Sequence, residues 1–166
     1  YDNLIRVFEE HPALEGIRES ARERYWKTFA VDALIGNFDR HAGNWGYILR
    51  RSEDRLVALA PVYDCGSSLY PQLSESAMAE LVRDKTALES RVRTFPTAAL
   101  RMGKRRVPYH EFLTSPQGAE ARTALLDLYQ RLDLDAVRQL IWETPLASDL
   151  RREFYATLVT VREETI

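Results

Sequence analysis

The chain has almost no cysteine, little net charge and no long apolar run, and each of these absences argues against a class of protein. Cys65 is the single cysteine among 166 residues, so an internal disulfide framework is impossible and a reducing compartment is favoured. The net charge of −2 does not point to direct nucleic-acid binding or to adsorption on a membrane surface. No apolar stretch approaches the ~20 residues of a membrane span, and no signal-peptide pattern is recognisable. We therefore expect a cytoplasmic protein without a membrane partner.

What the chain does contain is enough apolar sequence for one domain core. Hydrophobic residues make up 45% and charged residues 29% of the chain, which is ordinary for a soluble globular domain. No internal repeat and no low-complexity segment interrupts it. The sequence starts at Tyr1 rather than Met and enters an amphipathic pattern at once. We expect residues 1–166 to be a single domain and a piece of a longer protein.

Apolar spacings of three and four residues predict a mainly α-helical fold. A short helix is expected over residues 3–10 and a long helix from about Glu15 to Asn37, ended by Gly36 or Asn37 itself. Residues 83–108 are basic and are expected to be irregular. Further helices are expected over residues 74–82 (with Ser74 as a possible cap), 119–132, 134–143 and 148–164.

One segment changes from a helical to a strand-like pattern. Residues 45–51 and 55–62 are two apolar runs joined by a polar turn over 52–54, which predicts one β-hairpin embedded in the helical domain. Paired strands lie ~5 Å apart, so the start of the first strand and the end of the second should be neighbours. The hairpin is therefore expected to bring Asn44 close to Asp64, although twenty positions separate them in the sequence.

The residues that flank this hairpin have the side chains needed for phosphoryl transfer from a nucleotide. Asp39 lies five positions before Asn44, in the loop after the long helix, and Asp64 follows the second strand. In that chemistry an Asp orients or deprotonates the acceptor hydroxyl, while an Asn and a second Asp hold a divalent cation against the phosphates. Hard cations with oxygen ligands must separate a triphosphate from an acidic site. Each residue alone is typical of a turn, a cap or a strand end, so only their joint arrangement favours a site.

Other residues of the loop have two interpretations each. His41 could order the loop through a hydrogen bond or contact phosphate, and ligation of Mg²⁺ is disfavoured because that ion prefers oxygen to nitrogen. Arg40 could pair with Asp64 or Asp39, neutralise phosphate, or be simply exposed. Trp45 is expected in the core rather than stacked on a cofactor.

Two sequence segments together resemble the HipA-like serine/threonine kinases, bacterial proteins of which many are toxins of toxin–antitoxin pairs. The segments are residues 34–46 (LIGNFDRHAGNWG) and 59–68 (LAPVYDCGSS). Both segments and the spacing between them match, and the resemblance covers about residues 20–75 in detail. The remaining helices agree with the helical C-terminal lobe of a protein-kinase-like fold.

The resemblance implies a role for each residue of the predicted site. Asp39 would be the catalytic base, and Asn44 and Asp64 would bind Mg²⁺. His41 and Tyr63 would be neighbours of the bound nucleotide. The implied activity is transfer of phosphate from ATP to a protein of unknown identity, and the implied partners include an antitoxin protein.

The chain departs from that family's pattern in one respect. It contains neither a glycine-rich phosphate loop nor a strand with a phosphate-binding lysine, so the N-terminal lobe that covers ATP is not part of residues 1–166. We therefore expect this fragment alone to bind nucleotide weakly and not to turn over.

Two alternatives remain open from the sequence. The chain could be a non-catalytic binding or regulatory module with a kinase-like fold, docking a partner through its helices or through the basic stretch 101–106. It could also be a phosphoinositide-kinase-like lobe, whose catalytic loop has a similar Asp-Arg-His order. Those enzymes usually carry Asp-Phe-Gly where this chain has Asp64, Cys65 and Gly66.

Overall fold

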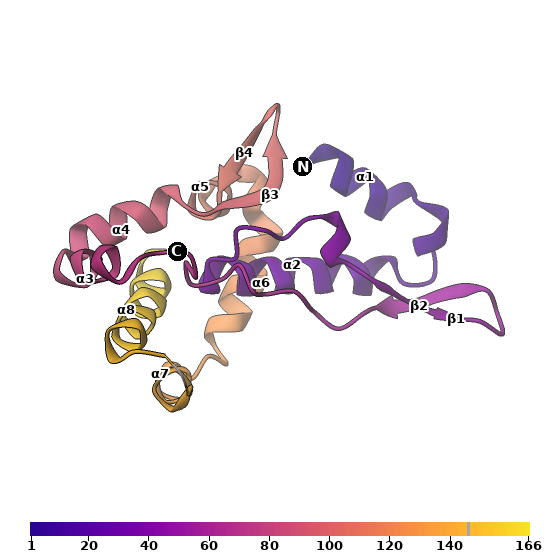
Figure 1. Cartoon of the computed structure of the whole chain (residues 1–166). Coiled ribbons are helices and arrows are strands. Elements are labelled where there is room, and N and C mark those ends of the chain that lie inside the picture. The colour runs from indigo at the N-terminus through magenta and orange to yellow at the C-terminus, as the bar shows by residue number, and fades with distance from the viewer. Residues whose placement is uncertain (146) are drawn as a thin grey trace.

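The computed structural model describes residues 1–145 and 147–166, and shows a mainly helical domain with two short antiparallel hairpins (Figure 1). The predicted mainly α fold with an embedded hairpin is confirmed. None of the helices in the described ranges is long and apolar enough to cross a membrane. The α-helices are α1 (Asp2–Glu10), α2 (Arg18–Ile35), α3 (Glu75–Arg83), α4 (Lys85–Thr94), α5 (Tyr109–Thr114), α6 (Ala119–Tyr129), α7 (Leu134–Glu143) and α8 (Asp149–Thr165).

The first hairpin forms where the sequence predicted it. Strand β1 (Tyr47–Arg50) pairs antiparallel with β2 (Arg55–Leu59), with Tyr47 opposite Leu59. The backbone N–H of Ala60 donates to the carbonyl of Gly46 at 2.8 Å, which extends the pairing beyond the strands. The segments that enter and leave this hairpin therefore lie side by side.

The expectation that residues 83–108 are irregular is wrong, first because a helix occupies residues 85–94. Asp84 caps α4 by accepting a hydrogen bond from the N–H of Ala87 at 2.9 Å. Leu88 and Val92, four residues apart, are fully buried. The remaining positions of α4 are largely polar or charged, so the apolar stripe is too narrow to dominate the local pattern.

The same stretch also contains a second hairpin, formed by β3 (Thr97–Met102) and β4 (Arg105–Pro108). Its buried face includes Ala98 and Leu100, which alternate with exposed residues. Alternation that depends on an alanine is a weak strand signal, so the sequence alone does not predict this strand.

Helix α2 runs through the middle of the domain and supplies much of its core (Figure 1). Trp26 stacks on Phe112 of α5 with ring centroids 5.8 Å apart, and Phe29 packs edge-on against the same ring. Ala30 and Ala33 are completely buried, and their small side chains allow neighbouring elements to approach the helix closely.

The end of α2 is fixed by a residue from the end of α8. Gly36 ends the helix in a left-handed conformation with φ of 65°, as the sequence predicted. Arg162, which is fully buried, donates from Nε and Nη2 to the carbonyl of Ala33 at 2.8 and 2.6 Å. A cation at this position satisfies a terminal carbonyl and opposes the partial negative charge of the helix end. Burial lowers the pKa of Arg162, yet an arginine remains charged in proteins.

The close contact at Gly36 generates a prediction about stability. A Cβ at Gly36 would lie 3.2 Å from Cζ of Arg162, whereas a Cβ at Gly103 would meet nothing within 4 Å. Both glycines have positive φ (65° and 62°), which costs a residue with a Cβ about 1–2 kcal/mol. We expect Gly36→Ala to lower the free energy of unfolding by more than Gly103→Ala does, as measured by urea denaturation. Equal losses would show that the Arg162 contact adds nothing to the backbone strain.

Candidate active site

A buried ion pair holds the loop that follows α2. Arg40 donates from Nε to Oδ2 of Asp32 at 2.7 Å and from Nη2 to Oδ1 at 2.9 Å, and both side chains are at most 5% exposed. The predicted pairing of Arg40 with Asp39 or Asp64 is wrong, as is the expectation of an exposed arginine. The partner belongs to α2, eight residues earlier. The hydrogen bonds to Asp32 raise the pKa of Arg40 above its ordinary value.

The same carboxylate organises the first part of the loop through Asn37. The side-chain Nδ2 of Asn37 donates to Oδ1 of Asp32 at 2.9 Å, and its Oδ1 accepts from the backbone N–H of Asp39 at 3.1 Å. From the far side, the hydroxyl of Tyr109 donates to the carbonyl of Asn37 at 2.8 Å. Burial raises the pKa of Tyr109 well above its ordinary value, so its hydroxyl remains a donor. The backbone of residues 37–39 is therefore held by hydrogen bonds to the side chains of Asn37 and Tyr109.

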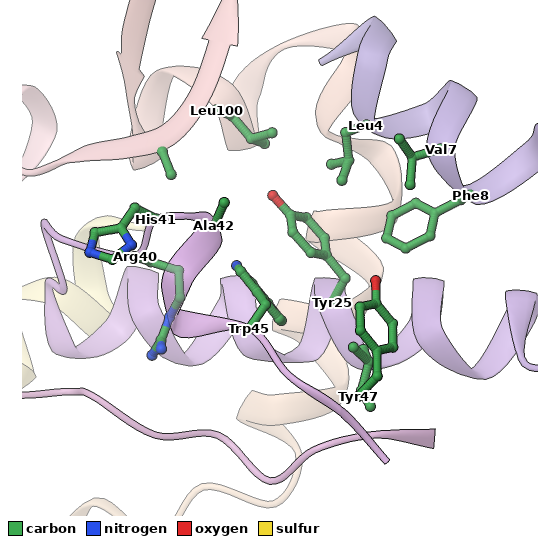
Figure 2. A pocket seen from close by; sticks show the side chains of 12 residues that line it. Leu4, Val7, Phe8, Tyr25, Arg40, His41, Ala42, Trp45, Tyr47 and Leu100 are labelled. Carbon is green, nitrogen blue, oxygen red and sulfur yellow. The ribbon is translucent and has the colours of Figure 1, made fainter. Parts of the chain in front are cut away.

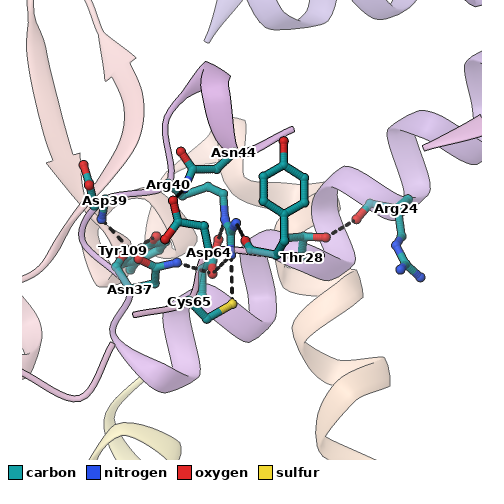
Figure 3. Close-up of polar contacts among 11 residues, drawn as sticks. Arg24, Thr28, Asn37, Asp39, Arg40, Asn44, Asp64, Cys65 and Tyr109 are labelled. Carbon is teal, nitrogen blue, oxygen red and sulfur yellow. Dashed lines mark hydrogen bonds and ion pairs between the residues drawn. The ribbon is translucent and has the colours of Figure 1, made fainter. Parts of the chain in front are cut away.

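Arg40 also reaches the segment that carries Asp64. Its Nη1 donates to the carbonyl of Tyr63 at 2.6 Å, and its Nη2 lies 3.3 Å from Sγ of Cys65 (Figure 3). Asp64 lies between these two contacts and has a left-handed backbone with φ of 56°. One guanidinium group thus connects α2 to the residues on both sides of Asp64 and holds an exposed, strained position in place.

The hairpin brings Asn44 and Asp64 together, as its predicted geometry required. Nδ2 of Asn44 donates to Oδ2 of Asp64 at 2.5 Å. Asn44 is 3% exposed, and its Oδ1 is buried without a hydrogen-bond partner among the described residues. A buried polar atom normally has a partner, and an unpaired amide oxygen beside a carboxylate offers the ligand type that Mg²⁺ prefers. The two side chains therefore fit a site for a hard cation.

Within the described ranges there is no cluster of three or more His, Cys, Asp or Glu side chains that could hold a metal ion. Mg²⁺ is usually held by one or two protein carboxylates together with waters and substrate phosphates. A site made of Asn44 and Asp64 would depend on the phosphates for its remaining ligands.

Asp39 presents a carboxylate that the fold does not use. The side chain is exposed, and its carboxylate makes no hydrogen bond or ion pair with any described residue. In Figure 3 it points away from the network of contacts, while its backbone N–H is part of that network. A fixed backbone with a free carboxylate is what a general base requires, because the oxygen must be available to an incoming hydroxyl.

His41 and Tyr63 both bind the backbone of Gly43. Nδ1 of His41 accepts from the N–H of Gly43 at 3.0 Å, and the hydroxyl of Tyr63 donates to its carbonyl at 3.0 Å. These bonds hold the short 3₁₀ turn over Ala42–Asn44. The loop-ordering interpretation of His41 therefore agrees with the observed hydrogen bond.

An apolar pocket of about 340 Å³ opens beside this turn (Figure 2). It lies among α1, α2, both hairpins and the loop, and Trp45 forms part of its wall. Trp45 was expected in the core, but it is half-buried and stacks on Tyr25 of α2 with ring centroids 4.9 Å apart. Its position at the pocket explains its partial exposure.

The sequence contained a signal for one of the residues that organise the loop and none for the others. Asp32 lies in the same stripe of α2 as the buried Phe29 and Ala33, and an acid on a buried face requires a partner. Tyr109 lies 72 residues from the backbone carbonyl that it binds, and no local pattern could have assigned that contact.

The chain is similar to known proteins in sequence and in fold. Residues 1–136 match the family described as the HipA-like C-terminal domain. The serine/threonine-protein kinase CtkA of Helicobacter pylori is 36% identical over 143 residues, which cover 86% of this chain and 44% of that protein. The crystal structure of the H. pylori proinflammatory kinase CtkA superposes with a TM-score of 0.90 at 30% identity, over 99% of this chain and 59% of that one. The chain thus spans less than half the length of the curated relative that it matches.

The buried ion pair generates a second prediction about stability. Asp32→Asn keeps the shape of the side chain but leaves the charged guanidinium of Arg40 buried without a counter-charge. We expect the free energy of unfolding to fall by about 3–5 kcal/mol in chemical denaturation. The matched control is Asp135→Asn, because Asp135 is largely exposed and pairs with Arg138 at 2.8 Å. An exposed pair contributes about 1 kcal/mol or less, so similar losses in the two variants would contradict the proposed importance of the buried pair.

Proposed function

The chain belongs to the family of HipA-like C-terminal domains, and from that premise we propose that it is the catalytic lobe of an ATP-dependent serine/threonine protein kinase. The observation that carries the proposal is the pairing of Asn44 with Asp64, which leaves a buried amide oxygen free beside a carboxylate. Asp39, on the same loop as Asn44, supplies the unengaged carboxylate that such a reaction needs. The name of the relative, a serine/threonine-protein kinase, supports the same reaction class.

Each residue has a distinct task in this proposal. Asp39 orients the hydroxyl of the acceptor serine or threonine and accepts its proton as phosphate is transferred. Asn44 and Asp64 would hold Mg²⁺, which would supply positive charge against the nucleotide phosphates. His41 and Tyr63 keep the Ala42–Asn44 turn in shape through Gly43, and we place both residues beside the bound nucleotide.

The ATP-covering lobe is proposed to come from the rest of a longer protein. Two apolar side chains of β1 outside the apolar pocket support this inference, because Ile48 and Leu49 are 46% and 47% exposed. Successive side chains of a strand point to opposite faces, so both faces of this strand expose apolar surface of the kind that contacts another part of a protein or a ligand. The hairpin also begins and ends at the proposed metal ligands, so a lobe resting on it would close over the nucleotide.

Asp39→Asn tests the proposed base in the intact protein that carries this domain. We expect the transfer of labelled phosphate from ATP to fall by about 10²-fold or more, because the amide cannot accept the proton. Folding should be unchanged, since the carboxylate of Asp39 makes no contact within the described residues. The control is Asp54→Asn in the turn of the first hairpin, because Asp54 is exposed as Asp39 is. Full activity of Asp39→Asn would refute the assignment, and no labelling by the unaltered protein would favour the non-catalytic alternative.

Asn44→Ala tests the proposed cation site separately. Removing the amide oxygen should raise the Mg²⁺ concentration for half-maximal activity by about tenfold or more, because loss of groups that merely support metal ligands already costs 10–100-fold in affinity. Asn3→Ala on the exposed face of α1 should leave the Mg²⁺ dependence as it is. An unchanged Mg²⁺ dependence in Asn44→Ala would argue against Asn44 as a ligand.

A further inference from the structure

The apolar pocket of Figure 2 adjoins the loop that carries the proposed base, and the proposed cation ligands are not among its lining residues. Its wall includes His41 and Ala42, which follow the base by two and three residues, whereas neither Asn44 nor Asp64 lines it. Arg40 also borders the pocket, but its guanidinium is committed to Asp32 and to the carbonyl of Tyr63. The pocket therefore flanks the loop of the proposed base, includes neither proposed cation ligand, and shares His41 with the proposed surroundings of the nucleotide.

The chemistry of the pocket wall is mainly apolar. Leu4, Val7 and Phe8 of α1 contribute to it together with Leu100 of β3 (Figure 2). Leu59 of β2 lines it as well. The side chain of Tyr25 also borders the space, and burial raises the pKa of its hydroxyl, so that group stays neutral. The volume of about 340 Å³ falls in the range of ~300–1,000 Å³ that is typical of ligand pockets. The pocket can hold a large apolar side chain.

An acceptor polypeptide that reaches Asp39 has neighbouring residues within reach of this pocket, because His41 and Ala42 belong to its wall. The acceptor hydroxyl has to come within hydrogen-bond distance of the Asp39 carboxylate, so the residues on either side of the acceptor lie against the adjoining surface. An extended chain advances about 3.3–3.6 Å per residue, so a side chain two or three residues from the acceptor spans roughly 7–11 Å. That reach is comparable with the two or three residues that separate Asp39 from His41 and Ala42 in the pocket wall.

We propose that this pocket binds a large apolar side chain of the protein substrate, two or three residues from the serine or threonine that receives phosphate. The inference rests on the proposed kinase function and adds a substrate preference to it. The occupant is a polypeptide segment with leucine, isoleucine, methionine or phenylalanine at that position. Binding there holds the acceptor hydroxyl at Asp39 without contact to the proposed cation ligands Asn44 and Asp64, which do not line the pocket.

The first measurement uses the intact protein, ATP and a positional library of serine peptides. Each position from five residues before to four residues after the serine is varied between leucine, phenylalanine, aspartate and lysine. We expect one position, two or three residues from the serine, at which leucine or phenylalanine gives a kcat/KM about 10–100-fold above aspartate. This range corresponds to the ~1.5–3 kcal/mol gained by burying one large apolar side chain.

Two variants on different elements test whether this pocket is the cause. Val7 (41% exposed) and Ala99 are accessible residues of the wall. Val7→Asp should make the pocket polar and Ala99→Trp should fill it, so each should reduce the apolar preference at least tenfold while the KM for ATP stays the same. Val31→Asp is the matched control, because Val31 is a helical valine of equal exposure (39%) outside the pocket, and it should retain the preference.

The outcomes separate this inference from the proposed function. A protein that phosphorylates peptides without an apolar preference, or whose preference survives in both variants, overturns the subsite but leaves the kinase function standing. A rise in the KM for ATP in both variants, with peptide preference unchanged, also overturns it and assigns the pocket to the nucleotide. An unaltered protein that labels no peptide overturns the kinase function and the subsite together.

Discussion

The buried pair of Asp32 and Arg40 is the interaction on which the candidate site depends. Through Asn37 the carboxylate fixes the backbone of Asp39, and through Arg40 it fixes the residues on both sides of Asp64. Removing two charges from water is costly, and their attraction offsets that cost only when the remaining donors and acceptors are satisfied. Here the side chain of Asn37 donates to the carboxylate of Asp32, and the carbonyl of Tyr63 accepts from Arg40. The segments next to Asp39 and Asp64 therefore supply partners for the buried pair. Local stability and the arrangement of the site therefore come from the same few hydrogen bonds.

The parts of the site that could be predicted from the sequence are those fixed by local geometry. The approach of Asn44 to Asp64 followed from a single hairpin, because strand pairing converts a sequence separation into a short distance. The partner of Arg40 was not predictable in this way, since it depends on which face of α2 is buried. Tyr109 and Arg162 act across 72 and 129 residues, and only the assembled fold brings them to the loop. In residues 83–108, helix α4 and the second hairpin contain few apolar residues, and charged residues lie between them. The apolar spacing there indicates neither a helix nor a strand clearly.

Helix α8 shows how far the support of the site extends. The family match ends at residue 136, yet Arg162 of α8 binds the last turn of α2, directly before the loop that carries the candidate site. The superposition with CtkA covers 99% of the chain, so this C-terminal part belongs to the shared fold as well. Among the described residues, the hydrogen bonds of the buried Arg162 go to the carbonyl of Ala33, where a cation opposes the partial negative charge of the helix end.

The walls of the apolar pocket have a consequence for how relatives of this protein could diverge. Val7 and Ala99 are solvent-accessible and lie on α1 and β3, so replacing them disturbs neither the packed centre of the domain nor the Asp32–Arg40 pair. Exposed positions usually tolerate substitution with little effect on stability. If the pocket selects the substrate as proposed, replacements at its rim would change the selected side chain and leave the Asp32–Arg40 pair in place.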